Sequence, residues 1–142
     1  MRVIGNLLWL VLSGIEMAFA YVVAGLLSIV LIVTIPLTAP AFRLAGYALW
    51  PFGRVVVRRP GAGAGSAIGN VVWFLVAGWW LALLHLVFAL LLALTIIGIP
   101  FAVVHVKLAG LALTPYGKDV VEAHTARADH VVVAAPAPLG RG

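Results

Sequence analysis

The sequence has no cysteine and very few acidic residues: of its 142 residues, four are Asp or Glu and nine are Lys or Arg. The absence of cysteine excludes disulfides, thiolate metal ligands and thiol nucleophiles. Charged residues make up 9% of the chain and apolar residues 65%, and the mean hydropathy is +1.21. Soluble domains have roughly 25% charged and 45–50% apolar residues. The composition therefore excludes an ordinary soluble domain and predicts an integral membrane protein.

Two stretches almost without charge carry this prediction. Residues 15–42 contain one charged residue, Glu16, and residues 68–106 contain no Asp, Glu, Lys or Arg. Because about 20 apolar residues suffice to cross a bilayer, each stretch is longer than one crossing needs. The first stretch also exceeds the apolar core of a secretory signal, so we expect it to remain in the mature protein.

Sequence signatures of catalysis are missing as well. The chain has no nucleophile elbow and no paired carboxylates, and its Gly-rich segment GAGAGS lacks the flanking strand and helix of a nucleotide loop. We therefore expect no enzymatic activity and no cofactor. The net charge of +5 comes from basic residues that flank the apolar blocks, while the aromatic residues lie within those blocks, so we expect no nucleic-acid partner.

The chain contains an internal duplication. Residues 5–57 align with residues 69–121 without a gap at a constant offset of 64, and 20 of these 53 positions are identical. Arg43 aligns with Lys107 in this register. Residues 58–68, which are rich in Arg, Pro and Gly, are predicted to form a flexible linker. Residues 122–142 are predicted to form a disordered cytoplasmic tail.

Each repeat divides at its Pro and Gly residues. In the second repeat, residues 69–78 are expected to lie along the membrane interface, residues 79–98 to span about 30 Å of hydrocarbon, and residues 101–117 to return. This returning arm is short, so it is either a tilted span or a re-entrant arm. The predicted fold is all-α and membrane-integral, with two tandem helical hairpins that have short interfacial and returning helices.

Five residues are predicted to form the structural turns of these hairpins. Proline ends a helix, and glycine tolerates a left-handed turn. The predicted turn residues are Pro36, Gly98, Pro100, Gly53 and Gly117.

The basic residues next to the apolar blocks predict the topology. They fall on one side of both proposed hairpins, which by the positive-inside rule is the cytoplasmic side. This arrangement gives a multi-pass protein with cytoplasmic termini and two repeats in parallel orientation. Inverted repeats would arise instead if the returning arms did not cross the bilayer again.

Arg43 and Lys107 are the first candidate site residues. Each lies seven residues after its proline, about 10 Å along a helix and therefore within the membrane if the arms return through it. Fixed cations at that depth could line an anion path or hold lipid phosphates. The alternative is that the long side chains extend to the headgroups from a shallow arm.

Glu16, His85 and His105 are the other candidates for ion or lipid binding. Glu16 aligns with Trp80, which we place at the interface, and it could serve in a proton relay or pair with Arg43. His85 and His105 could face each other across the second hairpin. Neither histidine has an acidic or cysteine neighbour, so we expect no metal site.

Several motifs of the second repeat match a known family. The repeat contains the start GN-x-x-W, the segment GWW-LAL, the break TIIGIPF, the run KLAG-x-AL and the stop P-Y-G-K. These motifs resemble the domain of the bacterial YccF inner-membrane proteins, and the first repeat has a weaker copy. The resemblance implies a small protein of the bacterial inner membrane with two such domains, and it implies no molecular activity.

Two functions remain open from the sequence. The first is an oligomeric anion channel or anion-binding pore, with the small residues Ala20, Ala24 and Ser28 allowing close helix packing in a homo-oligomer. The second is a non-conducting membrane scaffold or lipid-interacting accessory protein, with basic residues bound to anionic lipids. Membrane lipids are the expected partners in both.

Overall fold

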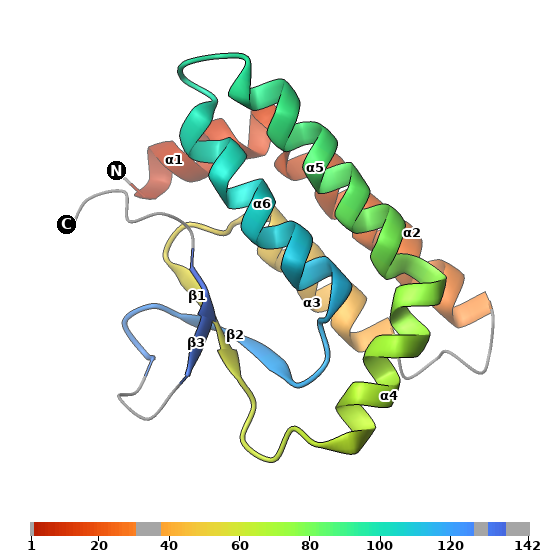
Figure 1. Ribbon diagram of the computed structural model, residues 1–142. Coiled ribbons are helices and arrows are strands. Elements are labelled where there is room, and N and C mark those ends of the chain that lie inside the picture. The colour runs from red at the N-terminus through yellow and green to blue at the C-terminus, as the bar shows by residue number, and fades with distance from the viewer. Residues whose placement is uncertain (1, 31–37, 127–130, 136–142) are drawn as a thin grey trace.

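The computed structural model describes residues 2–30, 38–126 and 131–135, and it consists of two helical hairpins with a small sheet at their side (Figure 1). The first hairpin and the strand that follows it comprise α1 (Arg2–Trp9), η1 (Leu10–Gly14), α2 (Ile15–Val30), α3 (Thr38–Leu49) and β1 (Arg54–Arg58). The second comprises α4 (Ala64–Trp73), η3 (Phe74–Gly78), α5 (Trp79–Ala93), α6 (Ile99–Leu113) and β2 (Lys118–Glu122), and is followed by β3 (Val132–Ala134).

Each hairpin begins with a long apolar helix. Residues Arg2–Val30 and Ala64–Ala93 form continuous helices of 29 and 30 residues, long and apolar enough to cross a membrane. The segment 69–78, predicted to lie at the interface, instead continues directly into α5, and α4 already begins inside the predicted linker. The π-helical turns η1 and η3 interrupt the two helices at equivalent positions.

A tryptophan fixes the returning helix of each hairpin. The indole N–H of Trp9 donates to the carbonyl of Ala48 at 2.6 Å, and that of Trp73 donates to Ala112 at 2.7 Å. A Cβ on Gly14 would lie 2.8 Å from the Trp9 ring, so the glycine at the end of the π turn makes room for the indole. The duplicated Trp and Gly residues are thus explained by packing.

An asparagine closes the base of each hairpin in the same way. The side chain of Asn6 donates to the carbonyl of Phe52 and accepts from its N–H, both at 2.9 Å. Asn70 accepts from the N–H of Tyr116 at 2.9 Å and donates to its carbonyl at 3.5 Å. Each asparagine therefore satisfies the backbone at the turn that follows its returning helix.

The turn residues behave partly as predicted. Gly53 and Gly117 adopt φ values of 98° and 75°, where only glycine is unstrained, and Pro100 lies in the first turn of α6. Gly98 does not adopt the predicted left-handed conformation, because its φ is −78°. It is needed for space, since a Cβ there would collide with the carbonyl of Leu92. Pro36 lies outside the described residues.

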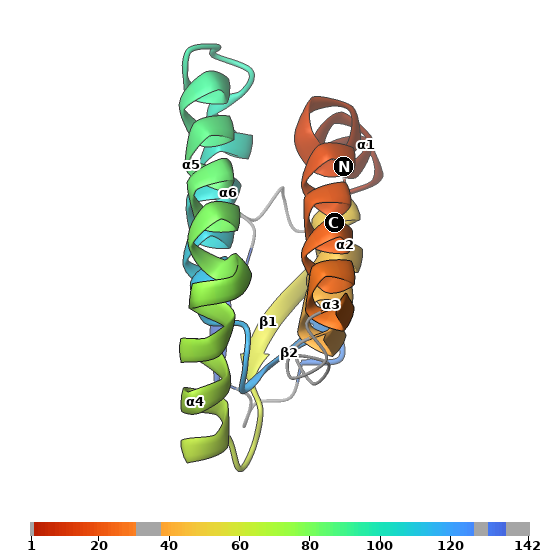
Figure 2. The same ribbon diagram turned by 90° about the vertical axis from the view of Figure 1, so that its right-hand side faces the viewer.

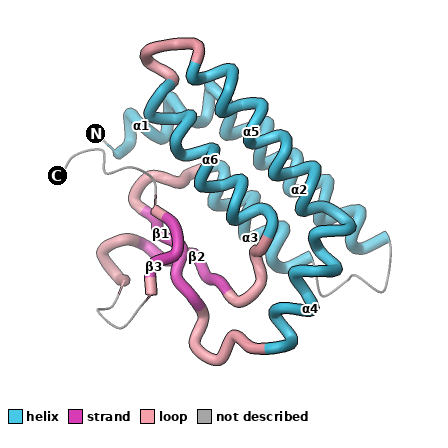
Figure 3. The backbone as a smooth tube through the Cα atoms, viewed as in Figure 1, coloured by secondary structure: helices cyan, strands magenta, loops and turns pink. Residues whose placement is uncertain are grey.

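The prediction of an all-α fold is wrong in one respect, because a three-stranded antiparallel sheet follows the helices in the order β2–β1–β3. Strand β3 comes from the segment that was predicted to be a disordered tail, and it pairs with β1 through Val56 and Val57. Both of these valines are buried. Figure 3 shows the strands on one side of the helices.

A pseudo-two-fold axis relates the two repeats. In the β1–β2 ladder Val56 pairs with Val120, its own equivalent at the offset of 64, and in the helical layer Tyr21 hydrogen-bonds His85, again its own equivalent. Two equivalent positions that touch each other lie on the symmetry axis. The axis therefore passes through the sheet and through the contact between α2 and α5.

This axis makes the two hairpins antiparallel, so the predicted parallel orientation is wrong. The ring of Trp9, in the first part of the first long helix, lies 6.3 Å from the ring of Phe101, in the first turn of α6. Parallel hairpins would instead place Trp9 beside the start of the second long helix. Figures 1 and 2 show α1 near the α5–α6 turn and α4 near the other end of the helical layer.

Candidate functional site

Charge is concentrated on the side of the molecule that carries the sheet, which we call the basic sheet side. Each member lies in a strand, directly beside one, or in contact with such a residue. The members are Arg2, Arg43, Arg54, Arg58, Arg59, Lys107, Lys118, Asp119 and Glu122. Seven of these residues are basic and two are acidic. Among the described residues, Glu16 is the only Asp, Glu, Lys or Arg outside this group.

Arg43 is fixed by the first two residues of β2. Its guanidinium donates to the carboxylate of Asp119 at 2.8 Å and to the carbonyl of Lys118 at 2.7 Å. The same carboxylate accepts two bonds from Arg59, at 2.6 and 3.0 Å. Arg43 therefore pairs with Asp119 and not with Glu16, and two arginines share one acid.

This cluster changes the acidity of Asp119. The hydrogen bonds from Arg59, followed by the charges of Arg59 and Arg43, hold the pKa of Asp119 below its ordinary value, although partial burial opposes them. Asp119 is thus ionised in the folded protein. Its negative charge leaves one excess positive charge in the three-residue cluster.

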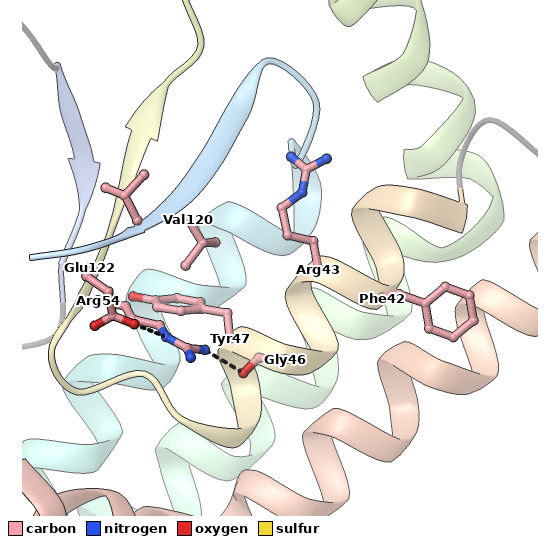
Figure 4. Close-up of a pocket in the computed structure, with 8 residues that line it drawn as sticks. Phe42, Arg43, Gly46, Tyr47, Arg54, Val120 and Glu122 are labelled. Atoms are coloured by element: carbon pink, nitrogen blue, oxygen red, sulfur yellow. Dashed lines mark hydrogen bonds and ion pairs between the residues drawn. The ribbon is translucent and has the colours of Figure 1, made fainter. Parts of the chain in front are cut away.

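Arg54 lines a pocket of about 310 Å³ between α3 and β2 (Figure 4). Its guanidinium donates to Glu122 at 3.1 Å and to the carbonyl of Gly46 at 3.3 Å. In Figure 4 the guanidinium of Arg43 points away from that of Arg54. The two arginines therefore do not converge on one anion in this pocket.

Lys107, the equivalent of Arg43, also lies against the sheet side. Its ammonium group is exposed and donates to the carbonyl of Ala135, next to β3, at 2.9 Å. Because Lys107 is in the middle of α6 and Arg43 in the middle of α3, the sheet flanks the returning helices along their length. Neither cation lies in the interior of the helical layer.

Glu16 lies away from the basic sheet side, among exposed apolar residues. This residue is exposed at the start of α2, next to exposed Ile15 and near exposed Phe19. It has no hydrogen bond or ion pair within the part of the chain that the structure describes. Within the described residues Glu16 therefore does not pair with Arg43.

The interior holds a polar chain that we call the histidine chain: Ser13, His105, His85 and Tyr21. The Ser13 hydroxyl lies 2.7 Å from Nε2 of His105, the two Nδ1 atoms of His105 and His85 are 2.9 Å apart, and Nε2 of His85 lies 3.0 Å from the Tyr21 hydroxyl. All four side chains are buried. The histidine chain connects both hairpins through the core.

Sequence reasoning brought the two histidines together but missed their partners. Tyr21 could have been found, because it aligns with His85 at the repeat offset and equivalent residues meet on a two-fold axis. Ser13 gave no such signal, since it lies 92 positions from His105. Among the described residues no group of three His, Cys, Asp or Glu side chains could hold a metal ion.

Comparison with known proteins assigns this protein to a family. The family model "YccF: Inner membrane component domain" matches residues 4–54 and again residues 68–118. The chain belongs to the YccF family. It is 34% identical to "Inner membrane protein YccF" of Escherichia coli K12 over 137 residues, which cover 90% of this chain and 93% of the relative.

The YccF protein of Shigella flexneri matches over the same length with the same identity. No solved structure matches the chain. These relatives, together with the two matching domains, make the chain an inner-membrane protein of the YccF family. The apolar helices and the duplicated Asn, Trp and Gly residues described above belong to its two YccF domains.

Proposed function

We propose that this YccF protein is a non-enzymatic, non-conducting membrane protein that binds anionic lipid headgroups with its basic sheet side. The separation of apolar and charged surface is the observation that supports the proposal. Large apolar side chains are exposed along the two long helices, among them Phe19, Leu86 and Leu90. The basic residues outnumber the acidic ones on the opposite, sheet-bearing side, which suits a negatively charged leaflet surface.

The sheet side is proposed to face the cytoplasm. Arg2 lies against Gly53 near the start of β1, and β3 belongs to the C-terminal segment, so the two ends of the described chain reach the same side. Lys and Arg are enriched on the cytoplasmic side of inner-membrane proteins. Both termini are therefore proposed to be cytoplasmic.

This placement determines how the helices are inclined. Because the sheet flanks the middle of α3 and α6, upright helices would carry its charged residues to hydrocarbon depth, where each costs several kcal/mol. Helices inclined towards the membrane plane keep the sheet in water and the apolar surface in lipid. The 29 and 30 residues of the long helices, about 45 Å each, also exceed the hydrocarbon thickness of about 30 Å.

Lipid selectivity tests the proposal. Reconstituted protein should immobilise spin-labelled phosphatidylglycerol in preference to phosphatidylcholine, and the preference should weaken at high salt. Arg58 and Lys107 have no acidic partner in the described chain, so Arg58→Gln with Lys107→Gln should lower the preference roughly 30-fold, at about 1 kcal/mol per basic residue. Arg54→Gln is the matched control, because Arg54 is already paired with Glu122. An unchanged selectivity in the double variant would refute headgroup binding.

Cysteine labelling tests the orientation, because the natural chain has no cysteine. Arg58→Cys should react with a membrane-impermeant maleimide only from the cytoplasmic side, and Leu86→Cys should be protected on both sides. At the α5–α6 turn, Ile96→Cys should not react from the periplasm. Periplasmic labelling there would show a crossing hairpin and overturn the inclined placement.

A second candidate function is an oligomeric anion pore, favoured by the excess of basic residues on one side. Upright protomers could place their sheet sides around a shared aqueous path, which requires a homo-oligomer. Chloride flux into proteoliposomes, reduced by Lys107→Leu without loss of the oligomer, would support this pore. Absence of flux is the expected result for the lipid-binding protein.

A further inference from the structure

The histidine chain has a geometry that constrains its protons. Two Nδ1 atoms 2.9 Å apart can share a hydrogen bond only if one carries a proton and the other does not. One ring must therefore be the Nδ1–H tautomer, which leaves its Nε2 as an acceptor. The other ring must be the Nε2–H tautomer, whose free Nδ1 accepts the bond.

Two neutral patterns place one proton in each of the three contacts of the histidine chain. In the first, Ser13 donates to Nε2 of His105, Nδ1–H of His105 donates to His85, and Nε2–H of His85 donates to Tyr21. In the second pattern all three bonds run in the opposite direction. In either direction all three contacts of the histidine chain are hydrogen bonds, and the direction depends on where the protons lie.

The two-fold symmetry of the fold does not require this chain. At the equivalent positions of the other half, Ser13 is replaced by Ala77 and His105 by Ala41. Both alanines are buried. The symmetry-related positions are therefore buried without polar side chains, so the Ser13–His105 contact occurs at only one of the two equivalent places.

His105 also has the surroundings of a cation site. The ring of Trp9 stacks on it with centroids 4.5 Å apart, and the ring of Phe88 stacks at 5.5 Å with an interplanar angle of 15°. Aromatic faces attract cations, most strongly where water is excluded. The Ser13 oxygen and Nδ1 of His85 could accept both N–H groups of an imidazolium.

We propose that the His85–His105 pair is a binding site for a single proton, held on His105. Starting from the first pattern, a proton from solvent adds to Nε2 of His105, and the Ser13 hydroxyl turns to accept the new N–H. Nδ1–H of His105 continues to donate to His85, and Nε2–H of His85 continues to donate to Tyr21. No other bond changes, and the site gains one positive charge.

The surrounding groups limit the site to one proton. The groups that face the two rings are Ser13 from η1, Tyr21 from α2, Trp9 from α1 and Phe88 from α5. None of them carries a fixed charge. A second proton would remove the acceptor at Nδ1 of His85 and place two cations 2.9 Å apart, so the pair binds one proton and rejects the next.

Nitrogen-15 NMR of histidine-labelled protein in lipid nanodiscs tests the proposal. Near neutral pH the two buried rings should show complementary tautomers, joined by a coupling across the Nδ1–H···Nδ1 bond. As the pH is lowered from about 8 to about 3, they should together take up one proton. The proposal is overturned if both rings are Nε2–H tautomers, if each takes up a proton, or if neither does before unfolding.

A pair of serine variants separates proton binding from packing. Ser13→Ala removes the acceptor for Nε2–H of the imidazolium and should weaken proton binding roughly tenfold. Ser28→Ala removes another buried serine hydroxyl from the same long helix, where it bonds the carbonyl of Ala24, and should leave proton binding unchanged. Equal effects of the two variants, or none from Ser13→Ala, would assign the chain a structural role only.

Discussion

The duplicated asparagines give the sharpest test of what holds this fold together. Asn6→Ala removes two hydrogen bonds of 2.9 Å to the backbone of Phe52, at a side chain with no solvent exposure. Asn70→Ala removes the equivalent pair from Tyr116. There one bond is 3.5 Å long and the asparagine is partly exposed. The two variants therefore make the same chemical change in different surroundings.

The expected magnitudes follow from burial. Each lost hydrogen bond costs about 1 kcal/mol, and a buried N–H or carbonyl left without a partner costs about 1–3 kcal/mol. Asn6→Ala leaves both Phe52 groups unpaired in the interior, so its free energy of unfolding should fall by about 3–5 kcal/mol. Water can replace the side chain of Asn70, and the loss there should be about 1–2 kcal/mol.

Unfolding in mixed detergent micelles, followed by circular dichroism, measures both variants against the natural chain. The reasoning requires Asn6→Ala to be the less stable variant by at least about 1 kcal/mol. Equal losses would mean that burial does not determine the cost. A loss below about 0.5 kcal/mol for Asn6→Ala would mean that the closure of the first hairpin depends on other contacts.

Two further predictions concern the basic sheet side and its turns. The pKa of Asp119 is lowered in the folded protein, so the contribution of Asp119 to stability is complete above the unfolded pKa and is lost as the pH falls through the folded pKa. Asp119→Asn should therefore lower the free energy of unfolding by about 0.5–1 kcal/mol at neutral pH and reduce the loss of stability at acid pH. An unchanged dependence of stability on pH would exclude the pair with Arg59 as its source. Gly117→Ala should lower the thermal midpoint and cost about 1–2 kcal/mol of stability, because Gly117 has a φ of 75° and an added Cβ would lie 2.8 Å from Ala62. Gly110→Ala is the control and should raise the midpoint, because Gly110 lies in α6 with open space around it. Similar shifts in the two variants would contradict the backbone argument.

Much of the architecture could be predicted because it depends on local composition. Apolar runs longer than a crossing predicted membrane-length apolar helices, but not that residues 69–78 and α5 form one continuous helix. The turns at Pro100, Gly53 and Gly117 could be predicted from the backbone preferences of these residues. The offset of 64 predicted that the two repeats have equivalent helices and turns. Gly98 was predicted to be a turn for the wrong reason, because its role depends on a carbonyl that only the folded chain brings near.

The sequence by itself determined that this is a duplicated YccF-family membrane protein with charge beside its apolar blocks, because those properties belong to the order and type of residues. The tertiary structure decided that the hairpins are antiparallel, that Arg43 pairs with Asp119, and that Ser13 reaches His105. Each of these depends on contacts between residues that are 64 to 92 positions apart. The number of charges at the segment ends does not predict the two-fold axis on which β1 pairs with β2. That axis determines which side chains of the two repeats are in contact.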